Sequence, residues 1–312
     1  AVLSVTMAIG ALHLARMKAI VSKLVSIEEM AGMDILCSDK TGTLTKNQLT
    51  IGEPIIFEAT SKEELLLAAT LASEEQSDDV IDHAILEIIP SNINLKQYQV
   101  KKFMPFDPVH KRSSAQIQFN EQKFEVSKGA PQIILALVQN PNISKQVEDR
   151  VNQLASLGYR TLGIAKKEEE GDWRFLGLIP MFDPPREDSI DTIKQAKEMG
   201  LQIKMLTGDH IAIAKEISRK LNLGDNIVSA EDIFKEKQLN AINLENYDGF
   251  SEVFPEHKFK IVQALQRNDH IIGMTGDGVN DAPALKQADM GIAVSGATDA
   301  ARSAADLILT DP

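Results

Sequence analysis

The chain has one cysteine, no hydrophobic run long enough to cross a membrane and no Walker-type phosphate loop. Because Cys37 has no partner in the chain, no internal disulfide can form, which favours a reducing compartment with Cys37 as core filler. The uninterrupted apolar runs stop well short of the ~20 residues that a spanning helix needs. Without a Walker-type loop, a nucleotide cannot be held as P-loop proteins hold it.

Positive charge is also scarce. The 33 lysine and arginine residues are outnumbered by 45 acidic residues, which gives a formal net charge of −12. This balance argues against a nucleic-acid partner and suits a site that meets an anionic substrate through a metal ion. With 312 residues, 43% of them hydrophobic, the chain is long enough for two domains with separate cores.

The most informative stretch is the heptapeptide Asp-Lys-Thr-Gly-Thr-Leu-Thr at residues 39–45. It closely follows the apolar run Ile35-Leu36-Cys37, so Asp39 is expected at the carboxyl tip of a buried strand, where open α/β sheets bind ligands. A carboxylate there can attack a phosphoryl group and form an acyl phosphate. Gly42 and the threonines would leave backbone N–H groups and oxygens for phosphate and metal. For an isolated Asp-Lys-Thr-Gly, a simple acidic turn would be the better interpretation.

From Arg186 onward, helices alternate with short strands. Helices are expected at 187–199, 211–221 and 256–266, and strands at 201–206 and 270–274. Repeated βα units predict a doubly wound parallel sheet with polar loops at the carboxyl ends of its strands. Asp39, Thr207 and Asp277 stand at or directly after three strand ends, so they are expected along one edge of the sheet.

Between the two halves of this pattern lies a block with a different order of expected helices and strands. Its expected helices are at 63–72, up to Pro90 and at 144–157, and its strands are at 98–104, 114–119, 123–128, 161–165 and 173–179. Such strands predict an antiparallel sheet in an inserted α+β domain. We therefore expect one domain at 1–50 and 180–312 and an inserted domain at 51–179.

Two connections frame these domains. Apolar residues at helical spacing predict a helix over 17–33 that leads into the first strand. The stretch Asp183-Pro184-Pro185-Arg186 is stiffened by its prolines, and it is either a rigid turn or a hinge where the inserted domain rejoins.

The loop after the expected strand 270–274 carries two carboxylates, Asp277 and Asp281, four residues apart. Their oxygens are the hard ligands that Mg²⁺ prefers. Asp281 can also cap the helix that begins near Ala282, and both roles can hold at once. Elsewhere, the Thr207 hydroxyl and the Gly208 N–H can meet a transferring phosphate. Lys258 can neutralise its charge, although a lysine at a helix start is more often solvated.

The inserted block holds a second set of candidate residues, which combines an aromatic face with cations: Phe106, Lys111, Lys128, Gly129 and Arg160. Such a set can hold an adenine ring by stacking and its phosphates by charge. Taken singly, Phe106 is more often a core side chain and Lys128 an exposed charge at a strand end.

The heptapeptide resembles the phosphorylation signature of P-type ATPases, which pass through an aspartyl phosphate. Residues 28–38 and 248–258 resemble the plasma-membrane proton-pump branch of that family. The set that includes Phe106, Lys128 and Arg160 resembles its nucleotide-binding residues, and 183–186 resembles its hinge. These motifs span nearly the whole chain in the family's order. One departure is Pro108, where some branches carry an arginine.

The resemblance implies a haloacid-dehalogenase-like phosphorylation domain, α/β with a doubly wound parallel sheet, and an inserted α+β nucleotide-binding domain. Asp39 would accept the γ-phosphate of ATP, and Mg²⁺ would be held by Asp39, Thr41 and Asp277. The other implied catalytic residues are Lys40, Thr41, Thr207, Gly208, Asp209, Lys258, Asn280 and Asp281. ATP would be bound by the set at Phe106, Lys111, Lys128, Gly129 and Arg160.

By the same resemblance, the chain is the catalytic part of an ATP-driven cation pump, a P-type ATPase that most resembles proton exporters. The apolar residues 1–16 would be the cytoplasmic end of a transmembrane helix. The implied partners are ATP and the actuator and transmembrane domains of the same protein. The chain itself would be soluble and would lie at the cytoplasmic face of the plasma membrane, reaching the membrane only through segments outside it.

Two other functions stay open. Soluble phosphatases with an aspartyl nucleophile carry a second Asp two residues on, as general acid and base, where this chain has Thr41. A threonine cannot take that proton at neutral pH, so the acyl phosphate is expected to persist, as in a pump. The third function is a nucleotide-binding regulator without catalysis.

Overall fold

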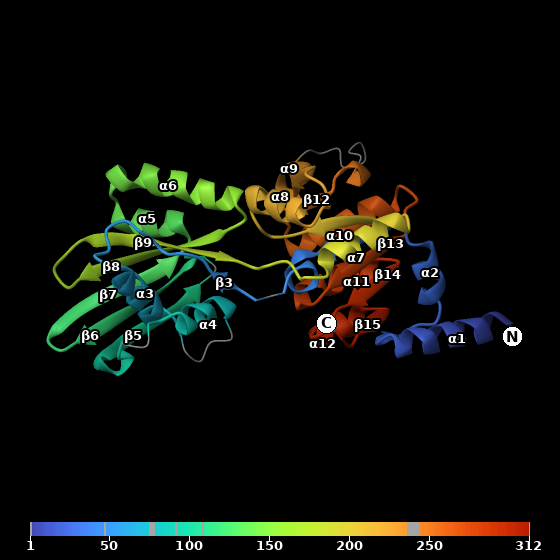
Figure 1. The fold of residues 1–312 in the computed structure, drawn as a ribbon, viewed down its shortest axis with the longest axis horizontal. Helices are drawn as coiled ribbons and strands as arrows, with labels where there is room; N and C mark the ends of the chain where they lie inside the picture. The colour runs from blue at the N-terminus through green and yellow to red at the C-terminus, as the bar shows by residue number, and fades with distance from the viewer. Residues whose placement is uncertain are drawn as a thin grey trace. The chain divides into compact units, whose positions relative to one another are not determined.

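The computed structural model describes residues 2–46, 48–74, 79–90, 93–107, 109–235 and 244–311. The chain divides into two compact units (Figure 1). The parallel-sheet unit comprises the residues before Gln48 and after Asp183, and the antiparallel-sheet unit runs between them. The sequence predicts the borders of the inserted domain at 51 and 180.

The parallel-sheet unit is built on eight strands in the order β1-β15-β14-β13-β2-β10-β12-β11. They are β1 (Ala19–Val21), β2 (Ile35–Asp39), β10 (Gln202–Leu206), β11 (Ile227–Ser229), β12 (Gly249–Ser251), β13 (Ile272–Gly276), β14 (Met290–Ala293) and β15 (Leu307–Leu309). All neighbours are parallel except β1 and β15. Because β2 lies between β10 and β13, the chain winds outward from it in both directions, which places a topological switch point at its carboxyl end.

The helices of this unit are α1 (Val2–Arg16), α2 (Ser26–Gly32), α7 (Ser189–Glu198), α8 (Ile211–Lys220), α9 (Ala230–Lys235), α10 (Pro255–Gln266), α11 (Ala282–Gln287) and α12 (Asp299–Ala304). α10 shows why they form. Pro255 starts it with a fixed φ, and Ile261, Val262 and Leu265 recur on one face and are fully buried. They pack in the main core of the unit, which includes Ile35 of β2.

The predicted helix over 17–33 is wrong. α1 ends at Arg16, Lys18 has a left-handed φ of 65°, and the chain then forms β1 and the short α2. β1 pairs antiparallel with β15, with Ala19 opposite Leu309. This partner is remote in sequence, so local periodicity could not reveal it. None of the helices in the described ranges has the length and apolar character to span a membrane.

The antiparallel-sheet unit has the strand order β3-β9-β8-β7-β6-β5, with β4 also paired to β9. The strands are β3 (Thr50–Ile51), β4 (Ile55–Ile56), β5 (Tyr98–Asp107), β6 (Arg112–Phe119), β7 (Gln122–Gly129), β8 (Arg160–Glu168) and β9 (Trp173–Phe182). The helices are α3 (Lys62–Leu71), α4 (Val80–Glu87), α5 (Pro131–Val138) and α6 (Pro141–Ser156). The sequence did not predict α5.

Figure 1 shows α3 and α4 on one face of this sheet and α5 and α6 on the other. Successive side chains of β9 point to opposite faces of the sheet, so Leu176 lies in the core under α3 and Phe175 lies in the core under α5. The unit therefore has one hydrophobic core on each face of its sheet, and the core under α3 includes residues of β5, β6 and β7. The chain thus has the two-domain α/β fold that the resemblance implies.

Candidate active site

Asp39 is the last residue of β2, at the centre of the parallel sheet. Leu206 of β10 lies opposite Asp39 on one side, and Thr275 of β13 lies opposite Ser38 on the other. The loops that follow these two strands begin at Thr207 and Asp277. Parallel register alone therefore brings the three polar loops to one edge of the sheet.

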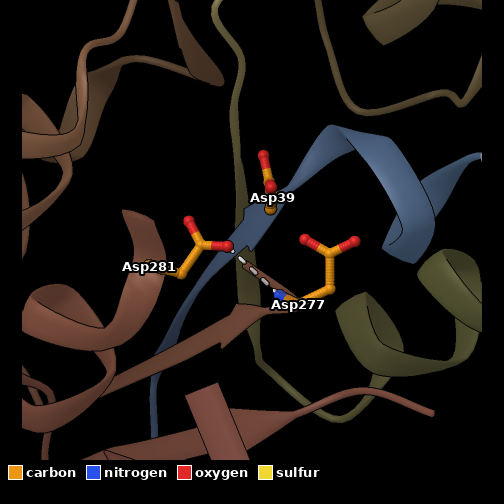
Figure 2. A group of neighbouring side chains, drawn as sticks. All are labelled: Asp39, Asp277 and Asp281. Atoms are coloured by element: carbon orange, nitrogen blue, oxygen red, sulfur yellow. Dashed lines mark hydrogen bonds between the residues drawn. The ribbon is translucent and has the colours of Figure 1, made fainter. Parts of the chain in front are cut away.

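Three carboxylates meet at this edge. Asp39, Asp277 and Asp281 each offer an oxygen within 4.8 Å of the other two (Figure 2). Asp281 Oδ2 also accepts hydrogen bonds from the N–H groups of Asp277 at 3.1 Å and Gly278 at 3.0 Å, so it orders its own loop. In the described part of the chain, Asp277 has no ion-pair partner. Clustered carboxylate oxygens of this kind fit a hard divalent cation such as Mg²⁺.

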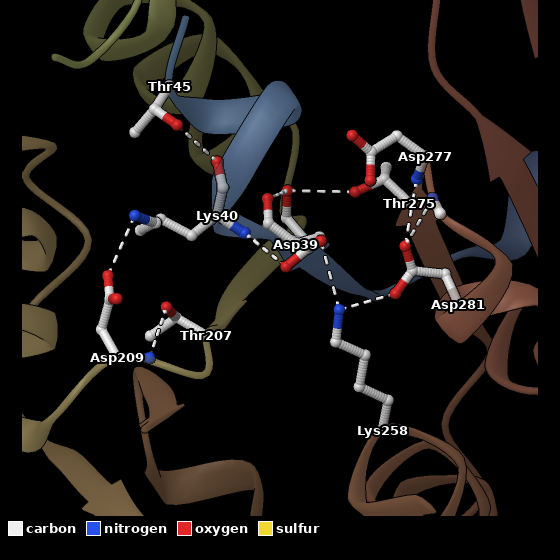
Figure 3. Close-up of polar contacts among 11 residues, drawn as sticks. Asp39, Lys40, Thr45, Thr207, Asp209, Lys258, Thr275, Asp277 and Asp281 are labelled. Atoms are coloured by element: carbon white, nitrogen blue, oxygen red, sulfur yellow. Dashed lines mark hydrogen bonds and ion pairs between the residues drawn. The ribbon is translucent and has the colours of Figure 1, made fainter. Parts of the chain in front are cut away.

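Lys258 lies among these carboxylates. Its Nζ is 3.1 Å from Asp39 Oδ2 and 2.6 Å from Asp281 Oδ1 (Figure 3). Only 8% of the residue is exposed, which excludes the solvated lysine that the helix start alone would favour. Burial by itself lowers the pKa of Lys258, but the two carboxylates outweigh it and raise the pKa above its usual value. Lys258 is thus a fixed positive charge beside the Asp39 carboxylate.

The Asp39 carboxylate is held in a poorly solvated position. Burial raises its pKa to about 6, against the lowering effect of Lys258 and with a further increase from the charges of Asp281 and Asp277. The pKa of Asp277 is also raised, by burial first and then by Asp281. A bound cation would stabilise the charged form of both carboxylates and so oppose these increases in pKa.

A second ion pair joins the loops after β2 and β10. Lys40 Nζ is 2.9 Å from Asp209 Oδ2, with side-chain exposures of 7% and 2%. The Asp209 N–H donates to Thr207 Oγ1 at 3.1 Å, while Gly208 between them is exposed. The buried pair fixes the Thr207 to Asp209 loop beside the start of the nucleophile loop, and Gly208 remains open to a ligand.

The nucleophile loop turns at Gly42, whose φ of 75° favours a residue without a side chain. Thr45 closes the turn, because its N–H and its hydroxyl both donate to the Lys40 carbonyl at 3.1 Å. Thr41 is partly exposed within this turn, and Asn280 is exposed in the turn before α11. Both lie at the same edge of the sheet as Asp39.

Two hydroxyl residues near Asp39 were not foreseen from the sequence. Thr275 Oγ1 donates to Ser38 Oγ at 3.1 Å, and both side chains are buried. This bond joins β2 to β13 one residue before the nucleophile. The sequence shows that each hydroxyl directly precedes a loop motif. It does not show that Ser38 and Thr275 meet, because that contact depends on β2 and β13 being neighbours in the sheet.

In the antiparallel-sheet unit, Lys128 is buried rather than exposed at a strand end. It donates to Ser73 Oγ at 2.6 Å and forms an ion pair with Asp82. Burial lowers the pKa of Lys128, and Asp82 offsets part of that shift. The sequence reasoning missed Ser73 and Asp82, although an acidic turn precedes α4.

The other predicted nucleotide residues follow the sheet register. Asp107, Arg112 and Gly129 stand in one row across β5, β6 and β7, which brings the predicted Phe106, Lys111 and Lys128 to one end of these strands. Phe106 is 55% exposed, so it is not a core side chain. A Cβ on Gly129 would lie 2.5 Å from the Lys111 carbonyl, so this close approach requires glycine. Arg160 is exposed and begins β8, the next strand.

Comparison with known proteins identifies the family of the chain. Residues 33–289 match the family model described as haloacid dehalogenase-like hydrolase. The chain is 55% identical over 100% of its length to a Methanocaldococcus jannaschii protein assigned by name to the cation-transporting ATPases, of which it covers 40%. It is 47% identical, again over its whole length, to plasma membrane ATPase 2 of Saccharomyces cerevisiae, of which it covers 35%.

A solved structure also shares the fold. The crystal structure of a zinc-transporting PIB-type ATPase in its E2.Pi state matches 99% of this chain and 43% of its own, with a TM-score of 0.65 and 23% sequence identity. The chain therefore spans well under half of each of these relatives. It belongs to the haloacid dehalogenase-like hydrolase family, and over its whole length it closely matches one part of the P-type plasma membrane ATPases.

Proposed function

We propose that this chain is the catalytic portion of an ATP-driven cation pump, in which Asp39 accepts the γ-phosphate of ATP. The observation that carries the proposal is the position of the Asp39 carboxylate, at the tip of the central strand and in contact with the buried Lys258 ammonium. Relatives that match the whole chain are named as cation-transporting or plasma membrane ATPases.

In the proposed reaction, an Asp39 oxygen attacks the γ-phosphorus, the bond from that phosphorus to the bridging oxygen breaks, and ADP leaves. Lys258 lies close enough to Asp39 to neutralise charge on the transferring phosphoryl group. Thr207 and Gly208 would donate to its oxygens. Asn280 and Asp281 would orient the site, and the Lys40–Asp209 pair would hold its loops.

The clustered carboxylates fit Mg²⁺, which would be held by Asp39, Thr41 and Asp277. When bound, it would neutralise phosphate charge and oppose the effects of burial and of the Asp281 charge, which raise the pKa of Asp277. In the other unit, Phe106 would stack on the adenine, and Lys111, Lys128, Gly129 and Arg160 would meet the rest of the nucleotide. Asp82, paired with Lys128, joins this set.

We further propose that the transported ion is a proton, because residues 28–38 and 248–258 resemble the proton pumps and several matching relatives are plasma membrane ATPases. In the full protein the chain would lie at the cytoplasmic face of the plasma membrane, joined to actuator and transmembrane domains. Thr41, which cannot act as a proton acceptor, favours a lasting phosphoenzyme over a soluble phosphatase.

Incubation with γ-labelled ATP and Mg²⁺ tests the proposal. We expect an acid-stable, hydroxylamine-labile adduct that is absent in Asp39→Asn and present in Asp225→Asn, a matched change at an exposed carboxylate. Asp39→Asn should still bind ATP at least as well, because it removes a negative charge near the γ-phosphate. ATP binding without an adduct on the unmodified chain would favour the regulator, and steady phosphate release would favour the phosphatase.

A further inference from the structure

A cavity of about 280 Å³ lies behind the nucleophile loop, between α7 and the sheet, entirely within the parallel-sheet unit. Its walls include Leu36 of β2, Ile203 of β10 and Ile193 of α7, and its loop side includes Gly42 and Thr43. A void of ~150 Å³ is already large enough to bind benzene. The volume is therefore sufficient for a ring-sized ligand.

The sequence of α7 explains why the space is there. The residues of this helix that line the cavity are Ser189, Thr192, Ile193 and Ala196, a spacing that places them on one face. Three of the four are small. The sheet opposite offers the small Ser38 and Thr275, which use their hydroxyls on each other. Helix and sheet therefore face each other without enough side-chain volume to fill the gap.

The lining also indicates the chemistry of an occupant. Most of the wall is apolar, which favours a ligand with a hydrocarbon ring, because the ring removes apolar surface from water. The charged residues in the lining have both signs: Arg186, its neighbour Asp188 at 4.0 Å, and Asp311. Two carboxylates against one guanidinium disfavour an anionic ligand.

One polar group in the lining residues is unsatisfied. Thr43 Oγ1 is buried and has no hydrogen-bond partner among the described residues. A rotation of about 120° about its Cα–Cβ bond would move the hydroxyl into the position of the methyl group. A ligand that offered a hydrogen-bond partner would favour the rotamer that satisfies this hydroxyl, because a buried unpaired hydroxyl is unfavourable.

We propose that this cavity binds a small uncharged aromatic or alicyclic alcohol, with its ring against the apolar wall and its hydroxyl bonded to Thr43. The site is separate from the proposed nucleotide and metal sites. It adjoins the nucleophile loop through Gly42 and Thr43, and Ser189 on its α7 side donates to the Leu44 carbonyl at 3.0 Å. A bound ligand would therefore contact α7 and the loop together.

The test uses benzyl alcohol and toluene, which have the same ring and differ in the hydroxyl. With methyl-labelled isoleucine, both probes should shift the Ile193 and Ile203 signals saturably, and benzyl alcohol should bind about 2–10-fold more tightly. Thr43→Val keeps the shape of the side chain and should remove this preference without changing toluene binding. Ala196→Leu extends a good helix former into the cavity and should weaken both probes at least about tenfold.

Three outcomes would overturn the proposal: no saturable shift at Ile193 and Ile203, full binding to Ala196→Leu, or an unchanged preference for benzyl alcohol in Thr43→Val. The Thr43 comparison decides the matter even if Ala196→Leu does not fold. None of these measurements involves phosphorylation, so the result is independent of whether Asp39 is a nucleophile.

Discussion

Lys258 is the residue on which the charge balance around Asp39 depends. Its ammonium contacts two of the three clustered carboxylates, and each of those contacts lies inside the protein. Charges in such a poorly solvated position interact more strongly than they do in water. The Lys258 side chain therefore opposes two effects that raise the pKa of Asp39: burial and the charges of the neighbouring carboxylates.

We expect Lys258→Gln to slow phosphorylation of Asp39 by ~10²–10³, the usual effect of losing one preorganised stabilising group. It should also raise the pKa of Asp39 further, because Lys258 is what lowers it. Rapid-quench measurement of adduct formation gives the rate. Lys260→Gln is the control, since Lys260 lies on the same helix with its side chain 47% exposed. If the two variants form the adduct at equal rates, Lys258 has only a structural role.

Phe106 offers a separate test at the residue scale. Because it is more than half exposed, Phe106→Ala should leave the fold intact and cost ~1–3 kcal/mol of ATP binding if the ring stacks on the base. Acetyl phosphate has no base, so its reaction with Asp39 should not change. Calorimetry and adduct formation measure the two effects, and Val109→Ala, at an 83% exposed neighbour, is the control. A loss with both phosphate donors would indicate misfolding instead.

Among the elements, β2 and β13 are joined at both ends. At their carboxyl ends, Thr275 bonds Ser38. At their amino ends, His270 bridges two carboxylates, with Nδ1 at 2.6 Å from Asp34 Oδ2 and Nε2 at 2.8 Å from Glu245 Oε2. Asp34 also accepts from the Ile271 N–H at 2.9 Å. The two strands that carry Asp39 and lead to Asp277 are thus held in register along their whole length.

The His270 bridge makes stability depend on pH. Burial lowers the pKa of His270, but the hydrogen bonds and charges of Asp34 and Glu245 outweigh it and raise the pKa in the folded state. The bridge therefore stabilises the fold fully below the unfolded value of ~6.5 and loses this effect as pH rises through the folded value. Urea midpoints of the unmodified chain and His270→Gln should differ more at pH ~5.5 than at pH ~8.5. The exposed His83→Gln should show no such pattern, and a difference independent of pH would contradict the bridge.

For the whole molecule, the proposed chemistry is divided between two units. The proposed nucleotide residues belong to residues 48–183, and Asp39, Lys258 and Asp277 belong to the other unit. The fold of each unit explains its own residues, because each set is placed by the register of its own sheet. One sheet collects carboxylates at its strand ends, and the other presents an exposed aromatic ring near buried Lys128.

We expect the isolated chain to bind ATP and form the adduct, yet to release phosphate far more slowly than the ~1–100 s⁻¹ typical of phosphoryl-transfer enzymes. Thr41 stands where a phosphatase carries its general acid and base, and the sequence contains no Thr-Gly-Glu. A phosphate-release assay over many turnovers measures this rate. Steady release within the usual range would revive the soluble phosphatase, with a hydrolytic base inside the chain.

The sequence by itself determined the α/β fold, the strand that ends in Asp39 and the family. These features follow from local patterns, such as the apolar run before the heptapeptide and the βα alternation after Arg186. Such patterns depend only on residues that are close together in the sequence. The phosphorylation, nucleotide and metal roles of individual residues were also read from motifs, and they stay predictions that the experiments above test.

Only the tertiary structure decided the surroundings of these residues. From the sequence alone Lys258 would be a surface lysine, but the packing of α10 against the Asp281 loop buries it. Lys128 would likewise be exposed, but its contacts with Asp82 and Ser73 lie inside the protein. The segment 17–33 is not one helix because β15 pairs with its start. Each of these contacts joins residues far apart in the chain, so burial, ion pairs and pKa shifts arise only when distant elements pack together.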